Sequence, residues 1–232
     1  MFRRNSWVRA ISRKTIYSAV WLAALSIEAG ATHPAPCHEN AMIVFDASGS
    51  MGVRHAGRRK IDIAREAIAD VLPNISQTRP TGLVTYSGGP ASACMDVALR
   101  VSPTIGSSPQ IVNELAGLRP AGPTPLTRAV RLAATTLRDR QASGIIVLVT
   151  DGHESCLGNV CALARQLASD PLKLRVHTIG FRLEGRNTSE LTCLSNLTGG
   201  TYTRASGLDA LRASLQSVLS CPRLAQSAPR VR

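Results

Sequence analysis

The sequence has 232 residues, 44% of them hydrophobic, which is enough apolar material for the core of one ordinary domain. Lys and Arg outnumber Asp and Glu by 27 to 15, and aromatic residues make up only 3% of the chain. Because few aromatic side chains stand among the charges, we exclude nucleic acid as a partner. The basic balance favours an acidic partner or attraction to an anionic envelope surface, or it serves solubility alone.

Residues 1–31 have the pattern of a signal peptide. Basic residues come first, an apolar run from about Ile16 to Ile27 follows, and the segment ends in Ala-Gly-Ala. The apolar run is about 12 residues long, well short of the roughly 20 that cross a bilayer as a helix. We predict cleavage after Ala31 and a periplasmic or secreted mature protein without stable membrane insertion. That mature chain, having lost five basic residues and one acidic residue, keeps a formal charge of +8.

Strand and helix patterns alternate after a short leader at residues 32–40. Continuous apolar runs with β-branched residues predict buried strands, and apolar residues at helical spacing predict helices, the first of which should stop at Pro73. We expect strands at 41–45, 81–87, 95–102, 144–150, 174–181 and 199–205, and helices at 60–72, 110–116, 126–141, 159–169, 188–198 and 208–220. This alternation predicts an α/β fold, a doubly wound and mainly parallel sheet with helices on both faces. The domain should span 41–221, with a flexible tail at 222–232.

All six cysteines lie beyond the predicted cleavage point, and an even count suits disulfide formation in an oxidising compartment. Cys156 and Cys161 are close enough in sequence to close a short loop, so we predict a bond between them. Cys37 and Cys221 flank the domain, and we expect them to clamp its ends. A zinc site that includes His153 is disfavoured, because the spacing is not that of paired zinc ligands.

Five oxygen-bearing side chains are predicted to converge at one edge of the sheet. Asp46 and Asp151 each end an apolar strand, Ser48 and Ser50 alternate in the loop after Asp46, and Thr124 lies in a proline-rich loop. Two neighbouring aspartates repel, and a divalent cation removes that repulsion. Carboxylates and hydroxyls without imidazole or thiolate favour Mg²⁺, Mn²⁺ or Ca²⁺ over zinc. Taken alone, the two serines would be better explained by helix capping or turn hydrogen bonds than by metal binding, and Thr124 and Asp151 reverse that preference.

From about Met42 to Leu219 the chain resembles the von Willebrand factor type A (VWA) domain family. That family has a metal-ion-dependent adhesion site with the pattern D-x-S-x-S, then a threonine, then an aspartate, and "DASGS", "GPTPL" and "TDG" fill every position. The stretches "TDGHESC", "CMD" and "GGTYTRA" are similar to those of a secreted bacterial single-domain type. The resemblance implies a six-stranded sheet with one antiparallel edge strand.

The resemblance also implies how the site works. Ser48, Ser50 and Thr124 would bind the metal directly or alternately, Asp46 and Asp151 would often act through water, and a carboxylate from a partner protein would complete the coordination. The i, i+2, i+4 spacing points three oxygens at one cation, and Gly49 and Gly52 would permit the tight turn.

We therefore expect a non-enzymatic, metal-dependent protein-binding module, an adhesin or scaffold, that recognises an Asp or Glu carboxylate on an envelope partner. One alternative is an assembly module with a mainly structural metal. A metal-dependent hydrolase is a weaker alternative, since "SGSMG" is not a nucleophile elbow. We expect His153 and Glu154 to face solvent and His177 to be a core histidine with a hydrogen-bond partner.

Overall fold

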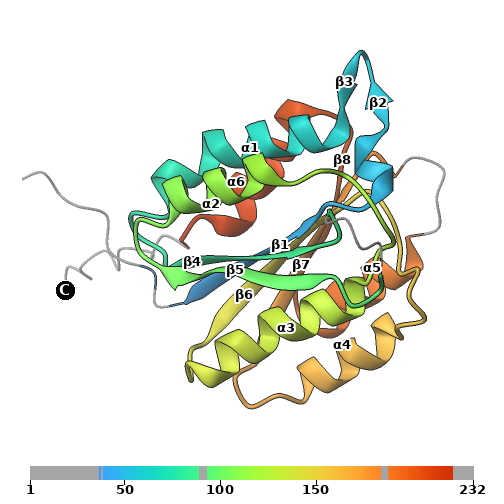
Figure 1. Cartoon of the computed structure of the whole chain (residues 1–232). Coiled ribbons are helices and arrows are strands. Elements are labelled where there is room, and N and C mark those ends of the chain that lie inside the picture. The colour runs from blue at the N-terminus through green and yellow to red at the C-terminus, as the bar shows by residue number, and fades with distance from the viewer. Residues whose placement is uncertain (1–36, 38, 89–92, 184–187, 222–232) are drawn as a thin grey trace, which may run out of the picture. The chain divides into compact units, whose positions relative to one another are not determined.

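A six-stranded sheet is covered on both faces by helices (Figure 1). The computed structural model describes residues 37, 39–88, 93–183 and 188–221. These residues belong to one of two units into which the chain divides, Pro34–Arg232. The predicted signal peptide, its cleavage point and the predicted C-terminal tail lie outside the described residues.

The strand order of the sheet is β5-β4-β1-β6-β7-β8. Neighbouring strands are parallel except β4 and β5, which pair antiparallel, so β5 is the antiparallel edge strand. The predicted α/β fold with a mainly parallel sheet is thereby confirmed. The strands of this sheet are β1 (Asn40–Asp46), β4 (Thr81–Tyr86), β5 (Val97–Thr104), β6 (Gly144–Thr150), β7 (Arg175–Phe181) and β8 (Tyr202–Ala205).

The two faces of the sheet bury separate apolar clusters. Alternate residues of β1 point to opposite faces, Ile43 to one cluster and Val44 to the other, as the two-residue period of a strand requires. Helices α1, α2 and α6 pack on the Ile43 face, and α3, α4 and α5 pack on the Val44 face (Figure 1). The helices are α1 (Lys60–Ile75), α2 (Ser108–Gly117), α3 (Leu126–Asp139), α4 (Val160–Ala168), α5 (Ser189–Leu197) and α6 (Leu208–Leu219).

Several predicted boundaries differ from the observed ones, and two of these differences involve a proline. Helix α1 passes through Pro73 and ends at Ile75, because the buried Leu72 and Ile75 side chains hold the last turn against the core. Strand β5 reaches Thr104 and includes Pro103, whereas the sequence predicts that this strand ends at residue 102. A proline is tolerated there, since β5 lies at the sheet edge, where a missing N–H breaks no ladder on the open side.

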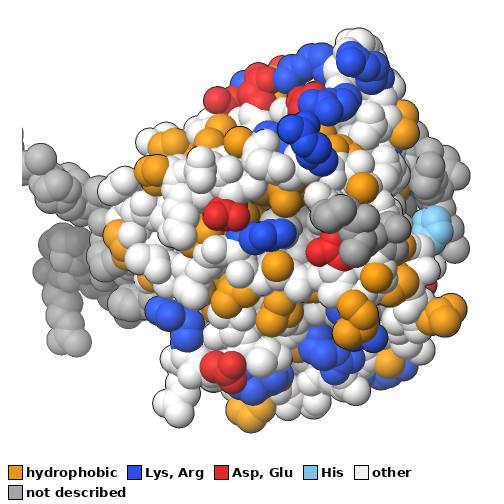
Figure 2. Space-filling view, in the orientation of Figure 1, with side chains coloured by type: hydrophobic (Ala, Val, Ile, Leu, Met, Phe, Trp, Pro, Cys, Tyr) orange, Lys and Arg blue, Asp and Glu red, His pale blue; other side chains and the backbone are white. Residues whose placement is uncertain are grey.

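A short hairpin that the sequence analysis did not predict projects from the molecule between the first loop and α1. The 3-10 turn η1 (Gly49–Gly52) leads into β2 (Arg54–His55) and β3 (Arg58–Arg59), which pair antiparallel. The connection uses positive φ angles of 47° at Ala56 and 79° at Gly57. Lys and Arg side chains gather over this end of the molecule (Figure 2).

Three disulfides join the described cysteines, and the predicted Cys156–Cys161 bond is wrong. Cys156 is bonded to Cys94, and Cys161 to Cys193. Cys161 lies in the first turn of α4, which packs against α5 and so faces Cys193, while Cys156 stays in the preceding loop. The expected clamp between the two ends of the domain is confirmed, because the Cys37–Cys221 bond joins residues 184 positions apart.

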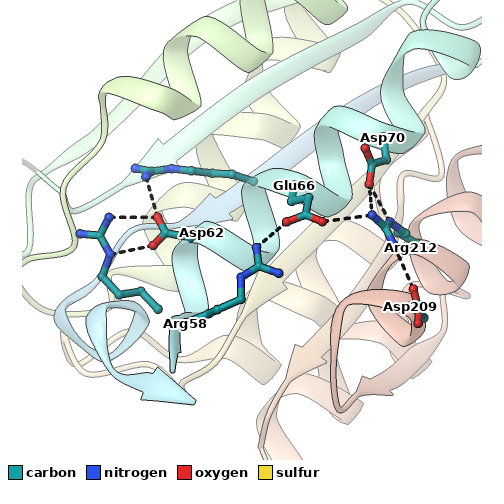
Figure 3. Close-up of polar contacts among 8 residues, drawn as sticks. Arg58, Asp62, Glu66, Asp70, Asp209 and Arg212 are labelled. Carbon is teal, nitrogen blue, oxygen red and sulfur yellow. Dashed lines mark hydrogen bonds and ion pairs between the residues drawn. The ribbon is translucent and has the colours of Figure 1, made fainter. Parts of the chain in front are cut away.

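Ion pairs connect α1 to α6 across the surface (Figure 3). Arg212 on α6 contacts both Asp70 and Glu66 on α1, and Glu66 also pairs with Arg58 of the hairpin. Exposed pairs of this kind contribute at most about 1 kcal/mol each. Within the described residues, no helix is long and apolar enough to span a membrane.

Candidate metal centre

The carboxyl ends of β4, β1 and β6 lie side by side, because the three strands are parallel neighbours. Asp46 is the last residue of β1, and Asp151 directly follows β6. The proline-rich loop between α2 and α3 is tied to this edge by backbone hydrogen bonds from Ala121 N to Ala47 O, 3.0 Å, and from Gly49 N to Gly122 O, 3.0 Å. Three separate loops are thus held against one edge of the sheet.

Asp46 is fully buried and accepts two hydrogen bonds. Its Oδ1 accepts from the backbone N–H of Ser48 at 2.8 Å, and its Oδ2 accepts from the Thr150 hydroxyl at 2.6 Å. Thr150 in turn accepts from the phenol of Tyr86 at 3.1 Å. Burial and the nearby charge of Asp151 raise the pKa of Asp46, in spite of these hydrogen bonds. Its ionised form is therefore disfavoured unless a cation lies close by.

A second set of contacts joins the serine loop to Asp151. The Ser48 and Ser50 hydroxyl oxygens are 3.0 Å apart, and Ser50 donates to Asp151 Oδ1 at 2.6 Å. The other carboxylate oxygen, Oδ2, lies 2.6 Å from the ammonium of Lys60, the first residue of α1. Asp151 is fully buried, and the Lys60 side chain is only 12% exposed.

Thr124 reaches the same place from the proline-rich loop. Its backbone N–H donates to Ser155 Oγ at 2.7 Å, and its carbonyl accepts from Ser155 N at 3.1 Å. A Cβ atom at Gly152 would lie 3.6 Å from Thr124 Oγ1 and 3.9 Å from Ser50 Oγ. Both hydroxyls therefore border the space that the absence of a side chain at Gly152 leaves free.

Glu154 holds the loop after Asp151 in place, which corrects the expectation that it faces solvent. Its two carboxylate oxygens accept from the backbone N–H groups of Thr127 and Cys156, each at 2.7 Å. The Cys94–Cys156 disulfide ties the same loop to the β4–β5 connection. His153 is exposed, as expected. His177 is half-buried, and its Nδ1 forms a hydrogen bond with the Thr201 hydroxyl at 2.9 Å.

Gly158 lets this loop pack against the start of α3. A Cβ atom there would lie 2.3 Å from Thr127 Oγ1 and 2.6 Å from Thr127 Cβ, so the backbone of one segment would have to move. We expect Gly158→Ala to lower the free energy of unfolding by about 1 to 3 kcal/mol, the usual cost of overpacking.

Urea titration of the Gly158→Ala variant measures this loss. Gly117→Ala is the matched control, because a Cβ atom at Gly117 meets nothing within 4 Å. Equal stabilities for Gly158→Ala and the wild type would show that the loop does not depend on this close approach.

The arrangement fits a hard divalent cation by its donor set, its space and its charge. Five oxygen side chains converge, Gly152 leaves room beside them, and the two buried aspartates bring two carboxylates, of which Lys60 pairs with one. Within the described residues, no three His, Cys, Asp or Glu side chains cluster as metal ligands, and all six cysteines are disulfide-bonded. The oxygens on hand for a cation at this edge are therefore the two carboxylates and the hydroxyls of Ser48, Ser50 and Thr124.

The sequence analysis missed three residues of the site. Thr150 and Tyr86 were assigned to strands without a role, although a threonine that ends an apolar strand beside an aspartate is a signal for a carboxylate partner. Lys60 gave no signal, since it is 91 positions from Asp151. The role given to two glycines is also corrected, because neither Gly49 nor Gly52 has a positive φ angle.

Comparison with known proteins decides the family. A profile of the von Willebrand factor type A domain matches residues 41–154. The chain is 30% identical to YwmD, an uncharacterized protein of Bacillus subtilis, over 186 residues that cover 73% of this chain and 80% of YwmD. The chain belongs to the von Willebrand factor type A domain family.

Solved structures agree on the VWA fold. The pilus adhesin SpaC of Lactobacillus rhamnosus GG superposes with a TM-score of 0.61 at 15% identity, covering 78% of this chain and 30% of SpaC. Proximal thread matrix protein 1 of the mussel byssus, with zinc in its adhesion-site motif, gives a TM-score of 0.60 at 17% identity, covering 80% of this chain and 46% of that protein. At these identities the likeness concerns the fold, and this chain spans less than half of either protein.

Proposed function

We propose that this protein is an exported, non-enzymatic binding module that holds a divalent cation and uses it to bind a carboxylate of a protein partner. The observation that carries the proposal is the convergence of Asp46, Ser48, Ser50, Thr124 and Asp151 from three loops at one sheet edge. Hydroxyls of Ser48, Ser50 and Thr124 would be the neutral ligands, and the two aspartates would supply the negative charge. When bound, the cation supplies a positive charge with room for one more anionic oxygen.

Mg²⁺ suits this donor set best. It takes oxygen ligands, keeps several waters and needs only one or two protein carboxylates, whereas a dedicated Ca²⁺ cage uses more. Mn²⁺ and Ca²⁺ accept the same oxygen ligands and are the other candidates.

Several features support a protein as the partner. Val53, Met95 and Leu157 are exposed apolar side chains on the connections after β1, β4 and β6, the three strands that end at the metal edge. Exposed apolar side chains beside a polar centre are typical of protein-binding surfaces. The exposed Arg54 and Arg58 of the hairpin add positive charge, which favours an acidic partner. One structural neighbour is a pilus adhesin and another a matrix protein.

Export and binding are favoured over the two alternatives by what surrounds the site. Three disulfides and the signal-peptide pattern of residues 1–31 support export. The Lys60–Asp151 ion pair balances part of the charge without any metal, which disfavours a purely structural cation. In the described part of the chain, no histidine is recorded as hydrogen-bonded to the five side chains, so a hydrolase would lack the commonest general base.

The proposal is tested by capturing the partner with and without metal. The tagged protein is crosslinked in envelope extract of its own organism, once with Mg²⁺ and once with chelator, beside the variant Thr124→Val. Valine keeps the shape of threonine but removes the hydroxyl, and the recorded hydrogen bonds of Thr124 are made by its backbone. We expect a protein that is captured only by the wild type in Mg²⁺.

A second step identifies the recognised group on the captured partner. Changing one of its Asp or Glu residues to the amide should abolish binding while its fold is kept. Capture that persists in chelator and with Thr124→Val would contradict the proposal.

A further inference from the structure

Lys60 is placed where a fixed positive charge controls the candidate metal centre. It begins α1, and its backbone N–H donates to Val53 O at 3.1 Å, so the closing of the β2–β3 hairpin fixes its position. Its ammonium lies 2.6 Å from Asp151 Oδ2, while Ser50 donates to Asp151 Oδ1 at 2.6 Å. Asp151 therefore has one oxygen toward the serine loop and one toward Lys60.

The Lys60–Asp151 ion pair adds one positive charge to the candidate metal centre. Asp46 and Asp151 bring two negative charges into a fully buried place, and Lys60 brings one positive charge. Elsewhere in the described chain, no Lys or Arg has a recorded contact with either carboxylate. With both carboxylates ionised, the site carries one net negative charge without a metal and one net positive charge with a divalent cation.

We propose that Lys60 is an internal counter-ion that lowers the affinity of the site for divalent cations and leaves the loaded site positively charged toward an anionic partner. The inference rests on the proposed function, since it concerns the same site. Like charges repel at close range, so Lys60 opposes the incoming cation. Once the cation is bound, the same charge keeps the site from becoming neutral, and a carboxylate is attracted more strongly.

A merely structural salt bridge would behave differently. Its loss would destabilise the protein and would leave metal affinity unchanged or weaken it, since Asp151 would lose its position. If Lys60 is an internal counter-ion, its removal changes stability and metal affinity in opposite directions. The metal-free protein becomes less stable, because a buried charge loses its partner, and the metal binds more tightly. The two roles are separated by measuring both quantities on the same variant.

The experiment compares the wild type with Lys60→Met, Lys60→Arg and Arg54→Gln. Methionine keeps much of the length of the lysine side chain without its charge, and arginine keeps the charge. Arg54→Gln is the matched control, because it removes one positive charge from the neighbouring hairpin, where Arg54 donates a hydrogen bond to Gly57 O at 2.7 Å. Binding of Mg²⁺ and of Mn²⁺ alone is measured by calorimetry, and melting temperatures are recorded in chelator.

We expect Lys60→Met to bind Mg²⁺ at least tenfold more tightly and to melt at a lower temperature in chelator. Lys60→Arg should stay within about threefold of the wild-type dissociation constant because it keeps the positive charge beside Asp151. Arg54→Gln should do so because screening weakens charges that do not touch the site. If Lys60→Met folds only when Mg²⁺ is present, its dissociation constant is taken from the Mg²⁺ dependence of its melting temperature and is compared with the wild type in the same way. Unchanged or weaker Mg²⁺ binding by Lys60→Met, with the wild type binding normally, overturns this inference alone. A wild type that binds neither metal overturns the proposed function together with it.

Discussion

Mg²⁺ at about one hundred times its dissociation constant is expected to raise the melting temperature of the wild type by about 5 to 10 °C, and Asp46→Asn to abolish the rise. A ligand that binds only the native state at this concentration stabilises it by about 2.7 kcal/mol. For a domain of this size, each kcal/mol corresponds to roughly 2 to 4 °C. Without the Asp46 charge, one carboxylate remains, and Lys60 already pairs with it.

Asparagine is the sharper substitution at this position, because the hydrogen bonds of Asp46 must be kept. Alanine would leave the buried Ser48 N–H without an acceptor, at a cost of about 1 to 3 kcal/mol, and would leave the Thr150 hydroxyl with its longer contact to Gly152 O at 3.3 Å. The amide keeps one oxygen for Ser48. Burial and Asp151 raise the pKa of Asp46, so the ionised carboxylate is disfavoured in the metal-free fold, and the uncharged amide removes that cost.

Thermal melts in Mg²⁺ and in chelator measure both effects. In chelator, we expect Asp46→Asn to melt no lower than the wild type. Thr124→Val serves as the second variant, since it removes one neutral ligand and should reduce the Mg²⁺-induced rise without changing the charge. If Asp46→Asn kept the full rise, the cation would bind elsewhere and the assignment of the five residues would be wrong.

Much of this site was predictable because its residues follow directly from strand ends. Asp46 and Asp151 end apolar runs that the sequence marks as buried strands, and parallel strands bring their carboxyl ends together. Ser48 and Ser50 follow Asp46 at every second position in the same loop, so their place beside Asp46 is also predictable from the sequence. The sheet with its helices on both faces follows from the same runs and the helical repeats between them.

The features that were missed depend on how separate elements pack. Lys60 meets Asp151 only because the hairpin turns the start of α1 back over the sheet edge. Cys161 pairs with Cys193 because α4 and α5 lie together, a contact that no local spacing reveals. Glu154 resembles any loop glutamate in sequence, and its role arises from two backbone N–H groups, one of them on α3.

The largest loss of stability is expected from removal of the Cys37–Cys221 clamp. In the chain-entropy account of disulfides, a bond that closes 184 residues contributes about 5 kcal/mol, while one that closes 32 contributes about 4 kcal/mol. The clamp also covers the buried Arg79, whose Nε donates to Cys37 Sγ at 3.1 Å and whose Nη2 donates to the Ser220 carbonyl at 3.4 Å. Losing it therefore frees both ends of the domain and uncovers a buried charge.

Urea titration of the Cys37→Ala/Cys221→Ala double variant measures the loss, with Cys161→Ala/Cys193→Ala as the short-loop comparison. The clamp joins the start of β1 to the end of α6, whereas the metal centre lies at the opposite, carboxyl end of β1. We therefore expect Mg²⁺ affinity to stay within about twofold of the wild type as long as the variant is folded, because the two effects concern distant and independent sites. A large drop in Mg²⁺ affinity of the folded variant would show that the metal edge depends on how the chain ends are held, and the two edges would then have to be treated as one coupled unit.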